Sequence, residues 1–271
     1  MTERASLSSV VLAIFSGVIL ILIASMMGEI ACAIALKFES VRVGANIIRG
    51  LVVVAVGLLL FHQTCAKVFR RSSASFRVPQ FTLDPVWVIV ACLLPIGVVS
   101  VLTQTAGRWA HNDLSSDAVF MIASGAIMFV GLSAALIEEL VFRGLIMSLL
   151  EERWGKRVAI IVPSVLFGLL HAIGTQLDPA SFGLLLVAGT MVGMMFSLIV
   201  YATGSVWNSV LVHAVWNAVI IGGVLEVGPP STNPIPAIYR YEMSSDSLLM
   251  TGGGFGVESS LVAVMGYLLV G

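Results

Sequence analysis

The stretch that decides the fold runs from residue 117 to residue 150 and reads DAVFMIASGAIMFVGLSAALIEELVFRGLIMSLL. After Asp117 its only charged residues are Glu138, Glu139 and Arg143. A helix crosses the hydrocarbon core of a bilayer with about 20 apolar residues. The stretch therefore predicts a transmembrane helix that is long enough to project beyond the bilayer.

The composition of the whole chain points the same way. Hydrophobic residues make up 58% of the 271 positions and charged residues 11%, whereas a soluble domain is about 25% charged. Lipid must therefore cover part of the surface, and the bilayer is the first predicted partner. A formal net charge of -1 gives no basic surface for nucleic acid, so we expect no nucleic-acid partner.

Apolar runs of this kind recur along the chain and predict an all-α, polytopic transmembrane helical bundle with seven or eight spans. We treat residues 1–271 as a single transmembrane domain. In the sixth span Gly189 and Gly193 form a GxxxG motif, which lets helices approach closely. The candidate spans cover residues 9–36, 45–62, 85–104, 117–150, 157–173, 181–202, 205–226 and 258–271.

The positive charges predict the orientation, because cytoplasmic loops carry an excess of Lys and Arg. With the N-terminus inside, the cytoplasmic segments hold eight such residues and the outer segments four: Arg4, Lys67, Arg70, Arg71, Arg77, Arg153, Lys156 and Arg157 against Lys37, Arg42, Arg108 and Arg240. We therefore expect an integral protein of the plasma (inner) membrane with a cytoplasmic N-terminus. The segment 227–257, rich in Pro and Gly, is either a lid or binding loop or a solvated outer linker.

Ionisable residues inside the spans are candidate functional residues, because each costs about 2.5–3.5 kcal/mol at the bilayer centre. Glu29 in the first span and Arg49 in the second lie at similar depth, which predicts a structural ion pair. In the fourth span Glu139 and Arg143 are four residues apart with the acid first, the favourable order for a pair on one helix. Glu138 points about 100° away from Glu139. It is either a second partner of Arg143 or a buried carboxylate that can act as a base.

Two further spans carry histidines at helical spacing. Phe167 and His171 share one face of the fifth span, and His213 and Asn217 share one face of the seventh. At about 1.5 Å per residue, Glu138, His171 and Asn217 lie about 18–21 Å above the cytoplasmic helix ends, and His213 about 12 Å. Three spans therefore bring polar groups to one layer of the bilayer.

Three ordered motifs resemble those of the CAAX-processing and bacteriocin-processing family of intramembrane proteases, also called the abortive-infection family. The resemblance covers a motif-bearing core of about residues 117–226. The motifs are EExxxR (Glu138, Glu139 and Arg143), FxxxH (Phe167 and His171) and HxxxN (His213 and Asn217).

The resemblance implies an eight-span helical fold and an endopeptidase that cleaves a peptide or membrane-protein substrate, as CAAX prenyl proteases do, with a glutamate-activated water. Glu138 would be the general base, helped by His171, and His213 and Asn217 would stabilise the oxyanion. Amide hydrolysis needs such a base, oxyanion donors and a proton for the leaving amine. The chain has no GxSxG motif, so a covalent serine nucleophile is poorly supported. No cofactor is expected.

The supporting residues are Glu139, Arg143 and Phe167, of which the resemblance assigns the first two to positioning the site. Two alternatives stay open. In a zinc-dependent membrane protease, Glu138, His171 and His213 would be the metal ligands and leave one coordination position open. In a non-enzymatic transporter or immunity protein, the same acids and histidines would form a proton relay or an interaction site.

Overall fold

The computed structural model describes residues 5–110, 112–230 and 237–271. Arg4 of the charge count and residues 231–236 of the Pro- and Gly-rich segment lie outside the described residues. Every predicted span is helical in the structure, although several bounds differ. The main helices are α1 (Leu7–Ala35), α2 (Ala45–Gln63), α3 (Pro85–Leu102), α7 (Lys156–Ala172), α8 (Pro179–Thr203), α9 (Val206–Trp216) and α11 (Leu261–Val270).

The decisive stretch forms one long helix, Ser116–Trp154. It consists of α4 (Ser116–Ser124), α5 (Ala134–Glu139) and α6 (Met147–Trp154), joined by π-helical turns at Gly125–Ser133 and Leu140–Ile146. Further π-helical turns extend α2 over Thr64–Val68 and α9 over Asn217–Ile221. Such turns are rare and occur often at functional sites, and the second joint begins directly after Glu139.

Among the described residues, five helices are long and apolar enough to cross a membrane: Leu7–Ala35, Arg42–Val68, Pro85–Leu102, Ser116–Trp154 and Pro179–Thr203. The prediction of a helical membrane bundle is thus confirmed, but the predicted count of seven or eight spans is not supported by this criterion. The reason is length, since α7 (Lys156–Ala172) has 17 residues and the apolar helices Val206–Ile221 and Leu261–Val270 are also shorter than the roughly 20 residues that a bilayer requires.

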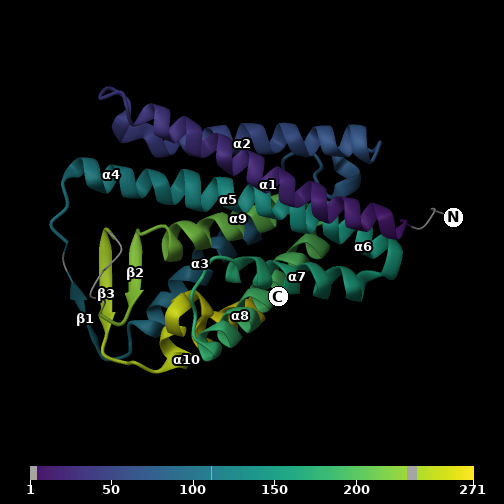
Figure 1. Cartoon of the computed structure of the whole chain (residues 1–271). Helices are drawn as coiled ribbons and strands as arrows, with labels where there is room; N and C mark the ends of the chain where they lie inside the picture. The colour runs from purple at the N-terminus through teal and green to yellow at the C-terminus, as the bar shows by residue number, and fades with distance from the viewer. Residues whose placement is uncertain (1–4, 111, 231–236) are drawn as a thin grey trace.

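The helices lie in layers around the long helix (Figure 1). α1 and α2 pack against each other on one side of it, and α9 packs on the other side. α7 packs along α8 and also contacts the long helix, α8 packs on α9, and α11 packs on α8 and α3. Buried side chains from these layers form one extended core.

Side-chain caps fix where several helices begin. Asp178 accepts from the backbone N–H groups of Ala180 (2.9 Å) and Ser181 (3.2 Å) at the start of α8. The Ser181 hydroxyl and these N–H groups lower the pKa of the Asp178 carboxyl below its usual value. Asp84 and Ser205 cap α3 and α9 in the same way. Caps of this type satisfy N–H groups that the first turn leaves unpaired.

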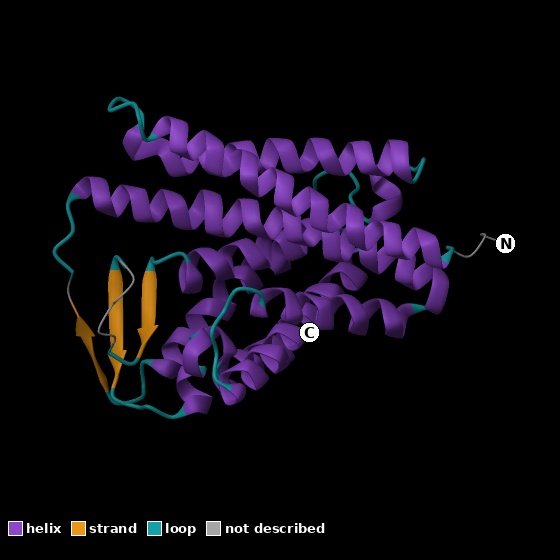
Figure 2. Cartoon of the chain, in the orientation of Figure 1, coloured by secondary structure: helices purple, strands orange, loops and turns teal. Residues whose placement is uncertain are grey.

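A three-stranded sheet, which the sequence did not predict, lies at the end of the bundle opposite the N-terminus (Figure 2). Its order is β1 (Gly107–Ala110), β3 (Tyr239–Met243) and β2 (Leu225–Gly228). β3 pairs antiparallel with β1 and parallel with β2. Strands of four or five residues carry too little periodicity to be recognised in a sequence. The segment 227–257 is therefore neither a structureless loop nor a linker in its described part, since it also contains α10 (Leu248–Thr251).

Several charged contacts lie at the end of the bundle where the N-terminus of the chain is placed. Arg71 pairs with Glu152 at 2.6 Å, and Arg77 pairs with Glu151. Arg153 donates to the backbone carbonyl of Ala5 at 3.1 Å. The segments predicted to lie on one side of the membrane therefore meet in the structure. The predicted pair of Glu29 and Arg49 is also confirmed.

Candidate active site

The site is organised around Glu139, whose side chain is 0% exposed. Its Oε1 accepts from Arg143 Nη1 at 2.9 Å and from His213 Nδ1 at 3.1 Å. Its Oε2 accepts from the Ser209 hydroxyl at 2.7 Å. A buried carboxylate is stable only when it is paired and hydrogen-bonded, and three donors from two helices meet that requirement here. The predicted pair of Glu139 and Arg143 is confirmed.

Arg143 links the acid to α8. Its Nη2 donates to the carbonyl of Gly193 at 2.9 Å, and its guanidinium carbon lies 4.7 Å from the ring centroid of Phe167 and 5.2 Å from that of Phe196. A Cβ on Gly193 would lie 2.9 Å from the backbone of Ser164 and 3.2 Å from Arg143 Nη2. The GxxxG motif therefore allows close helix approach, as predicted, and its second glycine also supplies an acceptor to the site.

His213 lies between the two acids of the EExxxR motif. Its Nδ1 contacts Glu139, and its Nε2 lies 3.7 Å from Glu138 Oε2. The imidazole stacks on the ring of Phe196 with a centroid distance of 4.5 Å. Because the carboxylate of Glu139 accepts the proton on Nδ1, only Nε2 is directed toward Glu138. A histidine held in this way by a second carboxylate has a fixed ring orientation and tautomer.

Glu138 differs from its neighbour in its hydrogen bonding. Its side chain is 18% exposed, and its buried Oε2 has no hydrogen-bond partner among the described residues. Glu139 has three partners, so the adjacent acids have different environments, as the 100° separation around the helix predicted. A carboxylate oxygen without a donor retains the lone pairs that a general base needs.

His171 is oriented from its own helix. Its Nδ1 lies 2.8 Å from the carbonyl oxygen of Phe167. A carbonyl can only accept, so Nδ1 carries the proton and the neutral ring leaves Nε2 as an acceptor. The ring also contacts the Phe167 ring with a centroid distance of 4.5 Å. Phe167 therefore holds His171 through its backbone and through its side chain.

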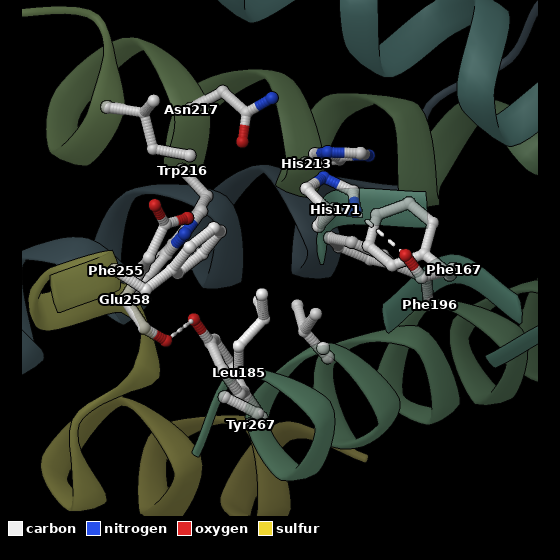
Figure 3. Close-up of a pocket in the computed structure, with 14 residues that line it drawn as sticks. Phe167, His171, Leu185, Phe196, His213, Trp216, Asn217, Phe255, Glu258 and Tyr267 are labelled. Carbon is white, nitrogen blue, oxygen red and sulfur yellow. Dashed lines mark hydrogen bonds between the residues drawn. The ribbon is translucent and has the colours of Figure 1, made fainter. Parts of the chain in front are cut away.

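Asn217 occupies the first position of the π-helical turn after α9. Its Nδ2 donates to the carbonyl of Val130 at 3.1 Å, and in Figure 3 its side-chain oxygen points toward the pocket. Asn217 therefore presents an acceptor to the pocket and not the expected donor to an oxyanion.

A pocket of about 60 Å³ opens beside these residues (Figure 3). His171, His213 and Asn217 line it, together with Glu258 from the turn Val257–Ser259 before α11. A cavity needs about 10–15 Å³ of such space to hold a water, so the pocket has room for water. Glu258 and His171 face it from opposite sides (Figure 3). Glu138 is not among the lining residues. Its Oε2 lies beside Nε2 of His213, which does line the pocket.

The predicted residues thus converge from three separate helical segments, but sequence reasoning missed four members of the site. Ser209 lies four residues before His213, so it continues the face shared with Asn217 and could have been found by spacing. Phe196 and the Gly193 carbonyl have no spacing signal. Glu258 was placed inside a predicted last span, whereas α11 begins only at Leu261.

The ligand set of the zinc alternative does not assemble. Within the described ranges, no group of three or more His, Cys, Asp or Glu side chains could hold a metal ion. Among the described residues, Glu138, His171 and His213 therefore do not form the three-ligand group that a tetrahedral metal centre needs.

Residues 120–219 match the family described as type II CAAX prenyl endopeptidase Rce1-like. This match confirms the family resemblance. All residues of the three motifs lie inside the Rce1-like segment, whereas Glu258 and the three strands lie outside it. No curated protein and no solved structure matches the chain. The Rce1-like segment and the apolar helices support a membrane-embedded hydrolase of the protease class.

Proposed function

We propose that the protein is an intramembrane endopeptidase that cleaves a peptide bond with a water activated by Glu138, without a metal ion. The observation that carries this proposal is the position of His213. It lies between the fully paired Glu139 and Glu138, whose Oε2 has no hydrogen-bond partner among the described residues. The Rce1-like match supports the reaction class, and the geometry supports the assignment of roles.

In the proposed reaction, Glu138 removes a proton from the attacking water while the water oxygen bonds to the scissile carbonyl carbon. Nε2 of His171 accepts a hydrogen bond from the same water and orients it. The protonated Glu138 then transfers that proton to the amine nitrogen as the C–N bond breaks. Each step uses a group that can hold a proton, and acids and bases that are held in position act efficiently.

The oxyanion of the tetrahedral intermediate would be stabilised by Nε2–H of a protonated His213. For Asn217 we propose a different role from that expected, namely acceptance of a substrate N–H by its side-chain oxygen. An oxyanion donor such as Nε2–H of His213 contributes about 10²–10³-fold to kcat.

The test is the substitution Glu138→Gln, which preserves shape and removes the base. We expect cleavage of a quenched reporter peptide by purified protein in lipid nanodiscs to fall by about 10²–10⁴-fold, with an unchanged melting temperature. Glu152→Gln on the same long helix is the matched control and should retain activity, because Glu152 lies near the C-terminal end of that helix, paired with Arg71. Cleavage by Glu138→Gln at the wild-type rate would contradict the assignment of the base.

A further inference from the structure

The outer edge of strand β2 has no pairing partner among residues 5–110, 112–230 and 237–271. β2 is the last strand in the order β1, β3, β2, and the N–H of Tyr239 bonds the carbonyl of Val224. Because successive residues of a strand direct their backbone groups to opposite edges, Glu226 also faces β3, while Leu225 and Val227 face away. In the described part of the chain, no backbone group pairs with that outer edge.

A cavity lies along this edge. It has a volume of about 370 Å³ and is bounded by β2 on one side and by residues 253–258 on the other. All four β2 residues line it, although consecutive side chains of a strand point to opposite faces. No residue of β3 lines it. The cavity is therefore in contact with the outer edge of β2 and not with one face of the sheet.

The cavity leads to the catalytic pocket. Ile221, Phe255 and Glu258 line both the cavity and the smaller pocket that contains His171 and His213. The four residues of β2 span about 13 Å, and the strand follows the π-helical turn that begins at Asn217. An extended chain lying along β2 would therefore pass Glu258 and reach the catalytic residues.

We propose that β2 binds the peptide substrate by strand addition, with the backbone groups of Leu225 and Val227 pairing with the main chain of the substrate. This inference rests on the proposed function. An exposed strand edge is a template for an added strand, and recognition by strand addition uses main-chain hydrogen bonds for affinity. Pro229 and Pro230 directly after β2 lack donors, so they limit the added strand to the four residues beside the cavity.

The first test uses substrate chemistry and the wild-type protein. A reporter peptide that the wild-type protein cleaves is prepared as a series, each member with one N-methylated amide. Strand addition predicts that kcat/KM falls about tenfold when the methylated amide faces β2, and that methylation of the amide between two such positions has little effect. A loss at consecutive positions, or at none, would overturn the inference.

The second test measures binding separately from catalysis. Leu225→Pro removes an outward N–H and leaves the bonds to β3 intact, whereas Leu225→Ala removes only the side chain. Both are made in the Glu138→Gln background, and binding of the fluorescent reporter is measured in nanodiscs. We expect the proline variant to raise Kd about tenfold, so that its Kd is at least about five times that of the alanine variant. Equal Kd values for the two variants would contradict strand addition.

The two proposals fail in different ways. If Glu138→Gln still cleaves the reporter, the assigned base is wrong, but the binding comparison still decides whether β2 holds the peptide. If cleavage depends on Glu138 and neither test shows an effect of the β2 edge, the protease proposal stands and strand addition is excluded. The N-methyl series also remains decisive if Leu225→Pro does not fold, because it requires no variant protein.

Discussion

Arg143 is fully buried although its guanidinium keeps its charge at any pH that a protein tolerates. The structure meets this cost with one carboxylate, one backbone carbonyl and three aromatic rings, from Glu139, Gly193, Phe142, Phe167 and Phe196. The pairing of Arg143 with Glu139 was predictable because the two residues are four positions apart on one helix. The contacts with Phe167, Gly193 and Phe196 were not, because they come from helices about 25 and 50 residues further along the chain.

At the residue scale we expect Glu139→Gln to destabilise the protein by about 3–5 kcal/mol, because it leaves the buried charge of Arg143 without its partner. The control is Arg108→Gln, which removes the pair with Glu242 at a guanidinium that is 79% exposed and should cost less than about 1 kcal/mol. Unfolding in one detergent, followed by circular dichroism, measures both. Equal stability of the two variants would show that Arg143 finds another partner.

At the element scale, the contact between α7 and α8 positions the site. Gly168 on α7 faces Gly189 on α8, and a Cβ on Gly189 would lie 2.7 Å from the Gly168 Cα. The same contact brings the Gly193 carbonyl to Arg143. The GxxxG spacing indicated that α8 approaches some helix closely, but only the tertiary structure identified α7 as that helix.

We therefore expect Gly189→Ala to force α7 and α8 apart, to cost about 1–3 kcal/mol, and to lower kcat by displacing Arg143. Gly183→Ala on the same helix is the matched control, because a Cβ there meets nothing within 4 Å and alanine favours helix by up to about 1 kcal/mol. Melting temperature and reporter cleavage are measured on both. An unaltered Gly189→Ala protein would show that the helix contact does not position the site.

At the scale of the whole molecule, the described chain gathers its buried acids and histidines at one site without forming a three-ligand metal group. Glu139 accepts from an arginine, a serine and a histidine, which is the environment of a structural carboxylate.

The purified protein is treated with a strong chelator until elemental analysis finds less than about one tenth of a zinc ion per chain, far below the single ion that a catalytic site requires. We expect reporter cleavage to persist after this treatment. Glu138→Gln with added zinc is the control and should stay inactive, because the missing base is a carboxylate. Activity that is lost on stripping and restored by zinc alone would support the zinc-dependent alternative.

The sequence by itself determined the bundle of helices, because apolar runs of about 20 residues have no stable place except in lipid or in a large core. It also determined the pairs made within one helix, such as Glu139 with Arg143, because helical geometry fixes which side chains meet. Ser209, four residues before His213, was within reach of the same reasoning.

Only the tertiary structure decided which helices meet and which group faces which. It placed His213 between two acids, turned the oxygen of Asn217 toward the pocket, and brought Glu258 to the site from outside the motifs. It also formed β2, whose four residues take their strand conformation from pairing with β3. Such features depend on contacts between distant segments, and local periodicity carries no record of those contacts.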